Sequence, residues 1–239
     1  MRIGLIAPPW IPVPPPAYGG TEVVIGNLAR GLLALGHDVR LFTVGESTCP
    51  VPRQWLFSSP VEPMSADKGV NHAVRAARRA GWPLIISAKM REPAERAYFE
   101  EQVRPLLRPG DARPAEQPLA ARLALLRNAV ALLNPITWPE PFGLVMAEAL
   151  ACATPVLAFP NGAAPEIIDH GRTGYLCQGE EDMTAALADV HRIDRPDCRA
   201  AAERRFSVAR MAADHERLYR AILARPGQLP CGLAEASAR

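Results

Sequence analysis

The chain has 239 residues, of which 49% are hydrophobic, so it is long enough for one or two domains with a sizeable core. Its 27 basic and 25 acidic residues are interspersed and give a net charge of +2, which does not favour nucleic acid or an acidic membrane as a partner. The sequence contains no run of about 18 apolar residues, so it predicts no membrane span. The five cysteines are scattered without a C-x-x-C pair, which argues against a disulfide framework or a zinc site. We therefore expect a soluble cytoplasmic protein without a metal or another cofactor.

The first 50 residues predict a βαβ unit. Residues 2–7 form a short apolar run that is typical of a buried strand, and a proline-rich loop follows it. A helix is expected from Thr21 to Leu35, where apolar residues recur at helical spacing, and Gly36 is suited to end it. A second strand is expected over Val39 to Val44.

After a segment rich in proline and serine, with Trp55 to Phe57 as a candidate strand, predicted helices and strands alternate almost to the C-terminus. We expect strands at 84–86, 129–133, 155–159 and 175–177. We expect helices at about 70–80, 119–128, 143–152, 164–169, 180–192, 197–205 and 207–224, and an amphipathic helix that places Phe99, Val103 and Leu106 on one face. This alternation predicts a parallel sheet that is covered on both faces.

The loop from Asn134 to Pro141 follows a predicted strand, at the edge of the sheet where open α/β folds bind ligands. Phe142, Gly143 and Leu144 would present backbone N–H groups at the start of the next helix, where a phosphate or a sugar hydroxyl can bind. Glu140 and Glu148 flank this point, and a carboxylate can accept hydrogen bonds from a pair of sugar or ribose hydroxyls. Two glutamates at this spacing are weak evidence alone, since a surface glutamate and a helix glutamate would give the same pattern.

The string Trp138-Pro-Glu-Pro-Phe-Gly-Leu-Val-Met-Ala-Glu148 is similar to the E-x7-E region of family-4 retaining glycosyltransferases of the GT-B type. The similarity continues through Ala164-Pro-Glu-Ile-Ile168 and Gly171-Arg-Thr-Gly174. It implies an α/β fold that is GT-B-like, with a truncated N-terminal βαβ unit at 1–50, a Rossmann-like C-terminal domain with a parallel sheet at 51–225, and a tail at 226–239. It also implies transfer of a sugar from a nucleotide-diphosphate sugar donor to an unknown acceptor, with retention and without an obligatory metal.

The resemblance assigns roles to individual residues. Glu140, with the amides of Phe142, Gly143 and Leu144, would hold the sugar, and Glu148 would hold the ribose. The segment Met64-Ser-Ala-Asp-Lys-Gly69 resembles the family's G-R-x-S-x-x-K-G loop, so Lys68 would neutralise the donor diphosphate. We therefore predict Glu140 and Lys68 as catalytic residues, although a lone lysine is more often a solvated surface residue.

Two further features bear on the donor phosphates. Gly19 and Gly20 resemble the family's glycine-rich loop, which faces these phosphates, although a glycine pair before a helix often marks only a turn. Glu62 and Pro63 stand where the family has its glycine and arginine. The missing arginine would leave the charge of the leaving group less stabilised.

The histidines match no metal-ligand spacing, and we expect them to be ordinary surface or capping residues. They are His37, His72, His170, His191 and His215.

The resemblance covers about residues 1–47 and 56–225, whereas two domains of roughly 150 residues need about 300. We therefore expect a large internal deletion that removes most of the first domain and its acceptor pocket. The βαβ unit is too small to form a core alone, and we expect the last helix to have little to contact there. Three alternatives stay open: an active glycosyltransferase whose missing acceptor surface comes from a partner chain, a degenerate non-catalytic nucleotide-sugar-binding protein or partner subunit, and a fragment without a stable function.

Overall fold

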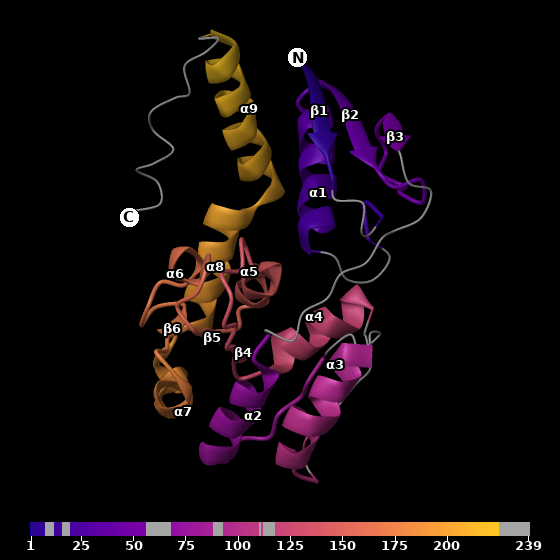
Figure 1. The fold of residues 1–239 in the computed structure, drawn as a ribbon. Helices are drawn as coiled ribbons and strands as arrows, with labels where there is room; N and C mark the ends of the chain where they lie inside the picture. Colours follow the sequence, from indigo (N-terminus) through magenta and orange to yellow (C-terminus); the bar gives the residue numbers. More distant parts are fainter. Residues whose placement is uncertain are drawn as a thin grey trace. The chain divides into compact units, whose positions relative to one another are not determined.

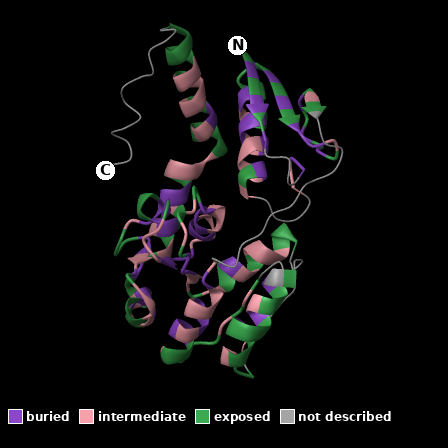
Figure 2. Ribbon diagram, in the orientation of Figure 1, coloured by how far each residue is buried: buried purple, intermediate pink, exposed green. Residues whose placement is uncertain are grey.

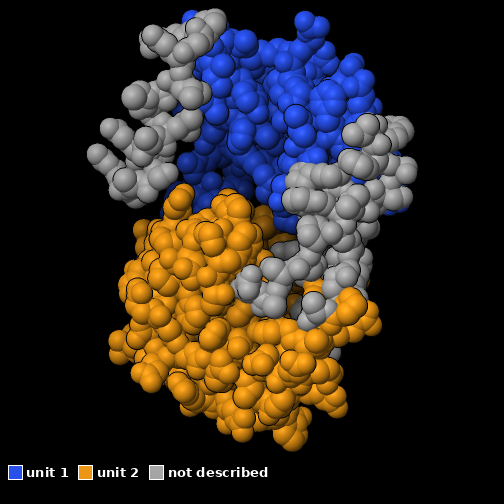
Figure 3. Space-filling model, in the orientation of Figure 1, with its two compact units in different colours: residues 1–62, 204–239 blue, residues 63–203 orange. Residues whose placement is uncertain are grey.

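The structure is a computed structural model that describes residues 1–7, 12–15, 20–55, 68–87, 93–109, 111 and 118–224 (Figure 1). The chain divides into two compact units: unit 1 comprises residues 1–62 and 204–239, and unit 2 comprises residues 63–203 (Figure 3). Each unit contains its own parallel sheet with helices, which confirms the predicted α/β fold. The predicted domain boundaries stay predictions.

Unit 1 contains a parallel sheet with the strand order β1-β2-β3, formed by Arg2–Ile6, Asp38–Thr43 and Arg53–Trp55. Helix α1 (Gly20–Ala34) connects β1 to β2, which confirms the predicted βαβ unit. Side chains along β1 and β2 alternate between exposed and buried, because successive residues of a strand point to opposite faces (Figure 2). The buried side chains of both strands form one hydrophobic cluster with α1.

Helix α9 (Val208–Ala224) completes unit 1 by packing against α1. The two helices approach closely at Gly31, where an added Cβ would lie 2.7 Å from the Cβ of Ala212. His37 is buried rather than on the surface, and its Nε2 lies 3.3 Å from Glu216 Oε1 of α9. The expectation that the last helix has little to contact in the N-terminal unit is therefore wrong. Its apolar side chains, with Met211 among them, cover part of the core that the βαβ unit alone leaves open.

Unit 2 contains a second parallel sheet with the order β4-β5-β6, formed by Leu132–Asn134, Val156–Ala158 and Gly174–Leu176. All three residues of β5 are fully buried, as expected for a parallel strand that is covered on both faces. Helices α5 (Leu144–Ala151) and α7 (Glu180–Asp189) contact β5.

The remaining elements surround this sheet or continue beyond it. Helix α2 (Val70–Arg79) packs against α7. The other helices are α3 (Pro93–Tyr98), α4 (Leu119–Asn128), α6 (Ala164–Ile167), the 3₁₀ turn η3 (Val190–Arg192) and α8 (Arg195–Phe206). Within the described ranges, none of the helices has the length and apolar character that a membrane crossing requires.

The predicted strand at 84–86 is wrong. Only Ile85 forms a β-bridge there, and its side chain is 55% exposed. The N–H of Leu84 donates to Asp111 Oδ1 at 3.2 Å instead of joining a strand ladder. The N–H group of Leu84 is therefore bonded to a carboxylate and cannot donate to a neighbouring strand.

Two other elements differ in their bounds or regularity. Strand β4 begins later than predicted, because Ala129 caps α4: its N–H donates to the carbonyls of Leu125 and Leu126, and its own carbonyl accepts from Arg195 at 2.9 Å. The predicted helix with Phe99, Val103 and Leu106 on one face begins as α3 (Pro93–Tyr98) and continues as a π-helical turn, η1 (Phe99–Val103), and a 3₁₀ turn, η2 (Arg104–Leu106). Phe99 and Val103 are nevertheless buried, as the apolar spacing predicted.

Candidate functional site

The start of α2 lies against the loop that follows β4. Gly69 has a φ of 65°, and a Cβ there would lie 2.0 Å from the carbonyl oxygen of Pro135, so only glycine fits this contact. Lys68 precedes it, and its Nζ lies 2.7 Å from Glu140 Oε2. The same ammonium lies 5.4 Å from the centre of the Trp138 ring, within the range of a cation–π interaction. The structure thus brings together Lys68 and Glu140, which are 72 residues apart in the chain.

The backbone of Glu140 is held by the segment that follows β5. The N–H of Ala163 donates to the carbonyl of Glu140 at 2.9 Å. Gly162 has a φ of 55°, and a Cβ there would lie 2.2 Å from the carbonyl oxygen of Glu140. The side-chain amide of Asn161 donates to the carbonyl of Ile136 at 2.8 Å. Neither Gly162 nor Asn161 could be predicted from the sequence, because their contacts depend on how two loops meet.

Gly143 forms the N-cap of α5. Its φ is 69°, and a Cβ there would lie 2.5 Å from Cε of Met146 and 3.4 Å from Cγ of Glu140. Leu144 is the first residue of α5, and Phe142 is partly exposed just before it. Helix geometry gives the first-turn N–H groups no acceptor within the helix, and the helix dipole makes this end positive. The ammonium, the carboxylate and the helix N-terminus together can bind an anionic ligand that carries hydroxyl groups.

Glu148 lies further along α5 and pairs with Arg122 of α4. Arg122 Nη2 donates to Glu148 Oε1 at 3.0 Å, and the two side chains are only 13% and 15% exposed. The other carboxylate oxygen, Oε2, is buried without a hydrogen-bond partner in the described part of the chain. The sequence analysis did not identify Arg122. The sequence feature that could have indicated it is a single arginine in the otherwise apolar stretch from Leu119 to Leu126.

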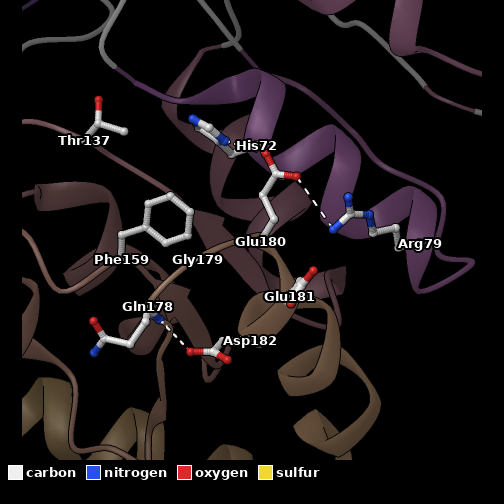
Figure 4. Close-up of a pocket in the computed structure, with 9 residues that line it drawn as sticks. All are labelled: His72, Arg79, Thr137, Phe159, Gln178, Gly179, Glu180, Glu181 and Asp182. Carbon is white, nitrogen blue, oxygen red and sulfur yellow. Dashed lines mark hydrogen bonds and ion pairs between the residues drawn. The ribbon is translucent and has the colours of Figure 1, made fainter.

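A pocket of about 630 Å³ opens beyond the carboxyl ends of β4, β5 and β6 (Figure 4). Each strand contributes a residue that follows it: Thr137, Phe159 and Gln178. His72 of α2 also lines the pocket, with its ring 5.7 Å from that of Phe159. His72, which we expected to be an ordinary surface or capping residue, therefore lies beside the sheet edge where α/β proteins bind ligands.

The first turn of α7 carries the strongest cluster of charge in this pocket. Glu180 Oε1 lies 2.6 Å from His72 Nδ1 and 2.7 Å from Arg75 Nε, and Oε2 lies 3.9 Å from Arg79 Nη1. Burial alone would raise the pKa of Glu180, but its hydrogen bonds with His72 and Arg75 and their charges outweigh this effect. The pKa of Glu180 is therefore lower than that of an ordinary glutamate.

Some of the predicted site lies elsewhere or outside the described residues. Gly20 is the first residue of α1 in unit 1, whereas Gly19, Glu62 and Pro63 are not described. In the described ranges, no group of three or more His, Cys, Asp or Glu is placed to hold a metal ion. The binding and catalytic roles assigned to the predicted site residues stay predictions.

Known proteins share both the sequence pattern and the fold. Residues 116–204 match the family model described as glycosyl transferases group 1. N-acetyl-alpha-D-glucosaminyl L-malate synthase of Bacillus anthracis is 31% identical over 116 residues, which cover 45% of this chain and 30% of that protein. The chain thus spans about a third of the length of the first curated relatives that it matches, at 30% and 33%.

Two solved structures are similar over most of the chain. One is AviGT4, a glycosyltransferase involved in avilamycin A biosynthesis, with 22% identity and a TM-score of 0.70 over 93% of this chain and 98% of that chain. The other is sucrose-phosphate synthase from Thermosynechococcus elongatus, with 16% identity and a TM-score of 0.73 over 93% of this chain and 99% of that chain. These similarities show a GT-B fold, and with the family match they support the glycosyl transferases group 1 family. The matched segment contains Glu140, Glu148 and Arg122.

Proposed function

We propose that this chain is a family-4 glycosyltransferase that transfers a sugar from a nucleotide-diphosphate sugar to an acceptor with retention. One observation carries the proposal: Lys68 Nζ lies 2.7 Å from Glu140 Oε2, beside the N-terminus of α5 and at the carboxyl end of a parallel sheet. A cation, a carboxylate and a helix N-terminus at this edge suit a ligand with both phosphates and hydroxyls. The family match over residues 116–204 supports the same chemistry.

Each predicted residue has a role in this proposal. Glu140 and the backbone amides of Phe142, Gly143 and Leu144 hold the sugar, and Glu148 holds the ribose. Lys68 binds the diphosphate, a role that the resemblance also assigns to Gly19 and Gly20.

The ion pair between Lys68 and Glu140 can be exchanged for contacts with a bound donor. Its side chains are 41% and 19% exposed, and such an exposed pair contributes only about 0–1 kcal/mol. A diphosphate offers Lys68 several charged acceptor oxygens in place of one carboxylate oxygen. Donor binding therefore turns the ammonium toward the phosphates, and it leaves the Glu140 carboxylate available to accept hydrogen bonds from sugar hydroxyls.

In the transfer step, the bond between the anomeric carbon and the diphosphate oxygen breaks while the acceptor hydroxyl forms its bond on the same face. The electron pair of the broken bond leaves with the diphosphate, and the acceptor proton follows it to a phosphate oxygen. The ammonium of Lys68 stabilises the charge that develops there. Removing one such donor typically costs about 10²–10³ in rate, so Pro63 at the usual arginine position predicts slow turnover.

Proton NMR of the released sugar tests this proposal. The protein is incubated with α-linked UDP-, GDP- and ADP-glucose, with water and simple sugars as acceptors. We expect an α-configured product, a rate that falls about 10²–10³-fold in Lys68→Ala, and partial recovery in Lys68→Arg. Lys89→Ala, at the other lysine of the chain, serves as the control and keeps the wild-type rate. A β-configured product would contradict retention.

A second candidate function is favoured by Pro63 and by the missing acceptor region. The chain would then be a degenerate nucleotide-sugar-binding protein, or a partner subunit of a complete enzyme. A partner chain would supply the acceptor surface that the proposed internal deletion removes. Donor binding without any release of sugar, either alone or with acceptors, would support this candidate over the active enzyme.

A further inference from the structure

We propose that Arg122 is a positioning residue that fixes one carboxylate oxygen of Glu148, so that the other oxygen accepts hydrogen bonds from the hydroxyls of a bound nucleoside. This inference rests on the proposed function, and it adds a residue from α4 to a site otherwise built from α2, α5 and their loops. Neither the E-x7-E string nor its spacing contains Arg122.

The contact between Arg122 and Glu148 is short and shielded from water. The two atoms lie 3.0 Å apart, and the side chains are 13% and 15% exposed. Charge-assisted hydrogen bonds are stronger than neutral ones, and they weaken less where water is excluded. A mostly buried glutamate that lacks such a partner leaves an unpaired charge in the interior, which destabilises the protein. Arg122 therefore fixes the Glu148 carboxylate in one orientation.

The helix that carries Arg122 is itself anchored to the segment after α5. Thr154 Oγ1 donates to the carbonyl of Leu126 at 2.6 Å, and Thr154 is fully buried. The guanidinium of Arg195 donates to the carbonyl of Arg127 at 2.9 Å. These bonds fix the end of α4 to the segment after α5 and to the start of α8, so the guanidinium of Arg122 occupies a defined place beside Glu148.

The second oxygen of Glu148 indicates what the pair binds. Oε2 is buried, and it has no hydrogen-bond partner among the described residues. Buried polar atoms are almost always hydrogen-bonded, and leaving one unpaired destabilises the folded protein. An ionised carboxylate only accepts hydrogen bonds, so the missing partner must be a donor. Sugar or ribose hydroxyls fit this requirement, whereas phosphate oxygens do not.

Because Arg122 acts through Glu148, its effect must depend on Glu148 and on the ligand hydroxyls. Binding of UDP, GDP and ADP is measured by calorimetric titration on the wild type, Arg122→Met, Glu148→Gln and the double variant. For the nucleotide that binds, we expect each single variant to weaken binding about ten-fold, as for the loss of one hydrogen bond to a charged group. The double variant should bind no more weakly than Glu148→Gln alone. The 2′,3′-dideoxy form of the same nucleotide should bind the wild type and Arg122→Met equally.

Two control variants and a check of folding make the outcomes distinct. Arg127→Met changes an exposed arginine on the same helix, and it should leave binding unchanged. Arg122→Lys keeps the charge but loses the planar geometry, so it should weaken nucleotide binding less than Arg122→Met and leave dideoxynucleotide binding unchanged. If thermal melting shows that Arg122→Met does not fold, the same comparison is made with Arg122→Lys.

Two results would overturn the role of Arg122 and leave the donor site standing. In one, the double variant loses as much nucleotide affinity as the two single losses multiplied together. In the other, Arg122→Met weakens binding of the dideoxynucleotide as much as binding of the ordinary nucleotide. Failure of the wild type to bind any of the three nucleotides would overturn the proposed function itself, together with this inference.

Discussion

At the residue scale, three groups of ionisable side chains in unit 2 join separate elements. Lys68 and Glu140 join the start of α2 to the loop after β4, and Arg122 and Glu148 join α4 to α5. Glu180 at the start of α7 joins His72 and Arg75 of α2. The first two pairs belong to the proposed donor site, whereas the third holds two helices together beside the pocket.

The pairing of Glu180 predicts a pH-dependent contribution to stability. Its pKa is lowered in the folded state, so its contribution is present above the ordinary value of 4.5 and is lost as the pH falls through the lowered value. We expect Glu180→Gln to reduce the free energy of unfolding by about 1 kcal/mol at neutral pH, and by much less near pH 3. Urea unfolding at both values measures this. Glu181→Gln, at the exposed neighbouring position, should cost little at either pH. An equal loss from Glu180→Gln at both values would contradict the account.

The sequence could predict some of these residues but not others. The resemblance identified Lys68, Glu140 and Glu148, because they belong to local strings. It could not identify Arg122, Gly162 or His72, whose neighbours lie in other parts of the chain. Such contacts arise only when separate elements pack together, and no local spacing records them.

At the element scale, the glycines around the loop after β4 control how closely other segments approach it. Gly69 lies against Pro135, and Gly162 lies against Glu140, both with a positive φ. The sequence predicted the helices and strands that flank this loop, since their apolar periodicity is strong. It did not predict the short β-bridge at Ile85 or the late start of β4, because side chains of Asp111 and Arg195 take the backbone hydrogen bonds there.

Gly162→Ala tests this control of the loop. The backbone strain of a left-handed alanine costs about 1 kcal/mol, and the new Cβ would also overlap the backbone of Glu140 at 2.2 Å. We expect a total loss of about 3 kcal/mol or more in the free energy of unfolding. Any folded fraction should also bind nucleotide more weakly, because Glu140 must move.

Gly171→Ala provides the matched control. Gly171 also has a positive φ, 77°, but no atom lies within 4 Å of the Cβ that would be added. It should lose only about 1 kcal/mol from backbone strain and should leave nucleotide binding unchanged. If Gly162→Ala and Gly171→Ala reduce the free energy of unfolding equally, the close contact between Gly162 and Glu140 does not explain the need for glycine at position 162.

At the scale of the whole molecule, the chain returns to unit 1 after unit 2, and α9 supplies part of the core of unit 1. This arrangement explains how a sheet of three described strands and one connecting helix forms a core. The sequence predicted α9 as a helix but not its partner, because the surface that it covers is assembled from both ends of the chain.

The contact between α1 and α9 can be tested with a pair of small substitutions. Gly31→Ala improves helix propensity by about 1 kcal/mol, but it places a Cβ 2.7 Å from that of Ala212. We therefore expect it to destabilise unit 1, with faster amide exchange in α1 and α9. Ala212→Gly should restore the close approach, so the double variant should be more stable than the sum of the two single changes in unfolding free energy predicts. Strictly additive effects would contradict a direct contact between the two helices.

The central claim is that unit 2 retains a working nucleotide-sugar donor site. Calorimetric titration of the purified protein with UDP, GDP and ADP, repeated on Glu148→Ala, tests this claim most directly. We predict that at least one of the three nucleotides binds, and that its binding weakens about ten-fold or more in the variant, whose unfolded fraction is checked by thermal melting. Absence of binding to all three, or equal binding by the wild type and Glu148→Ala, would contradict the account.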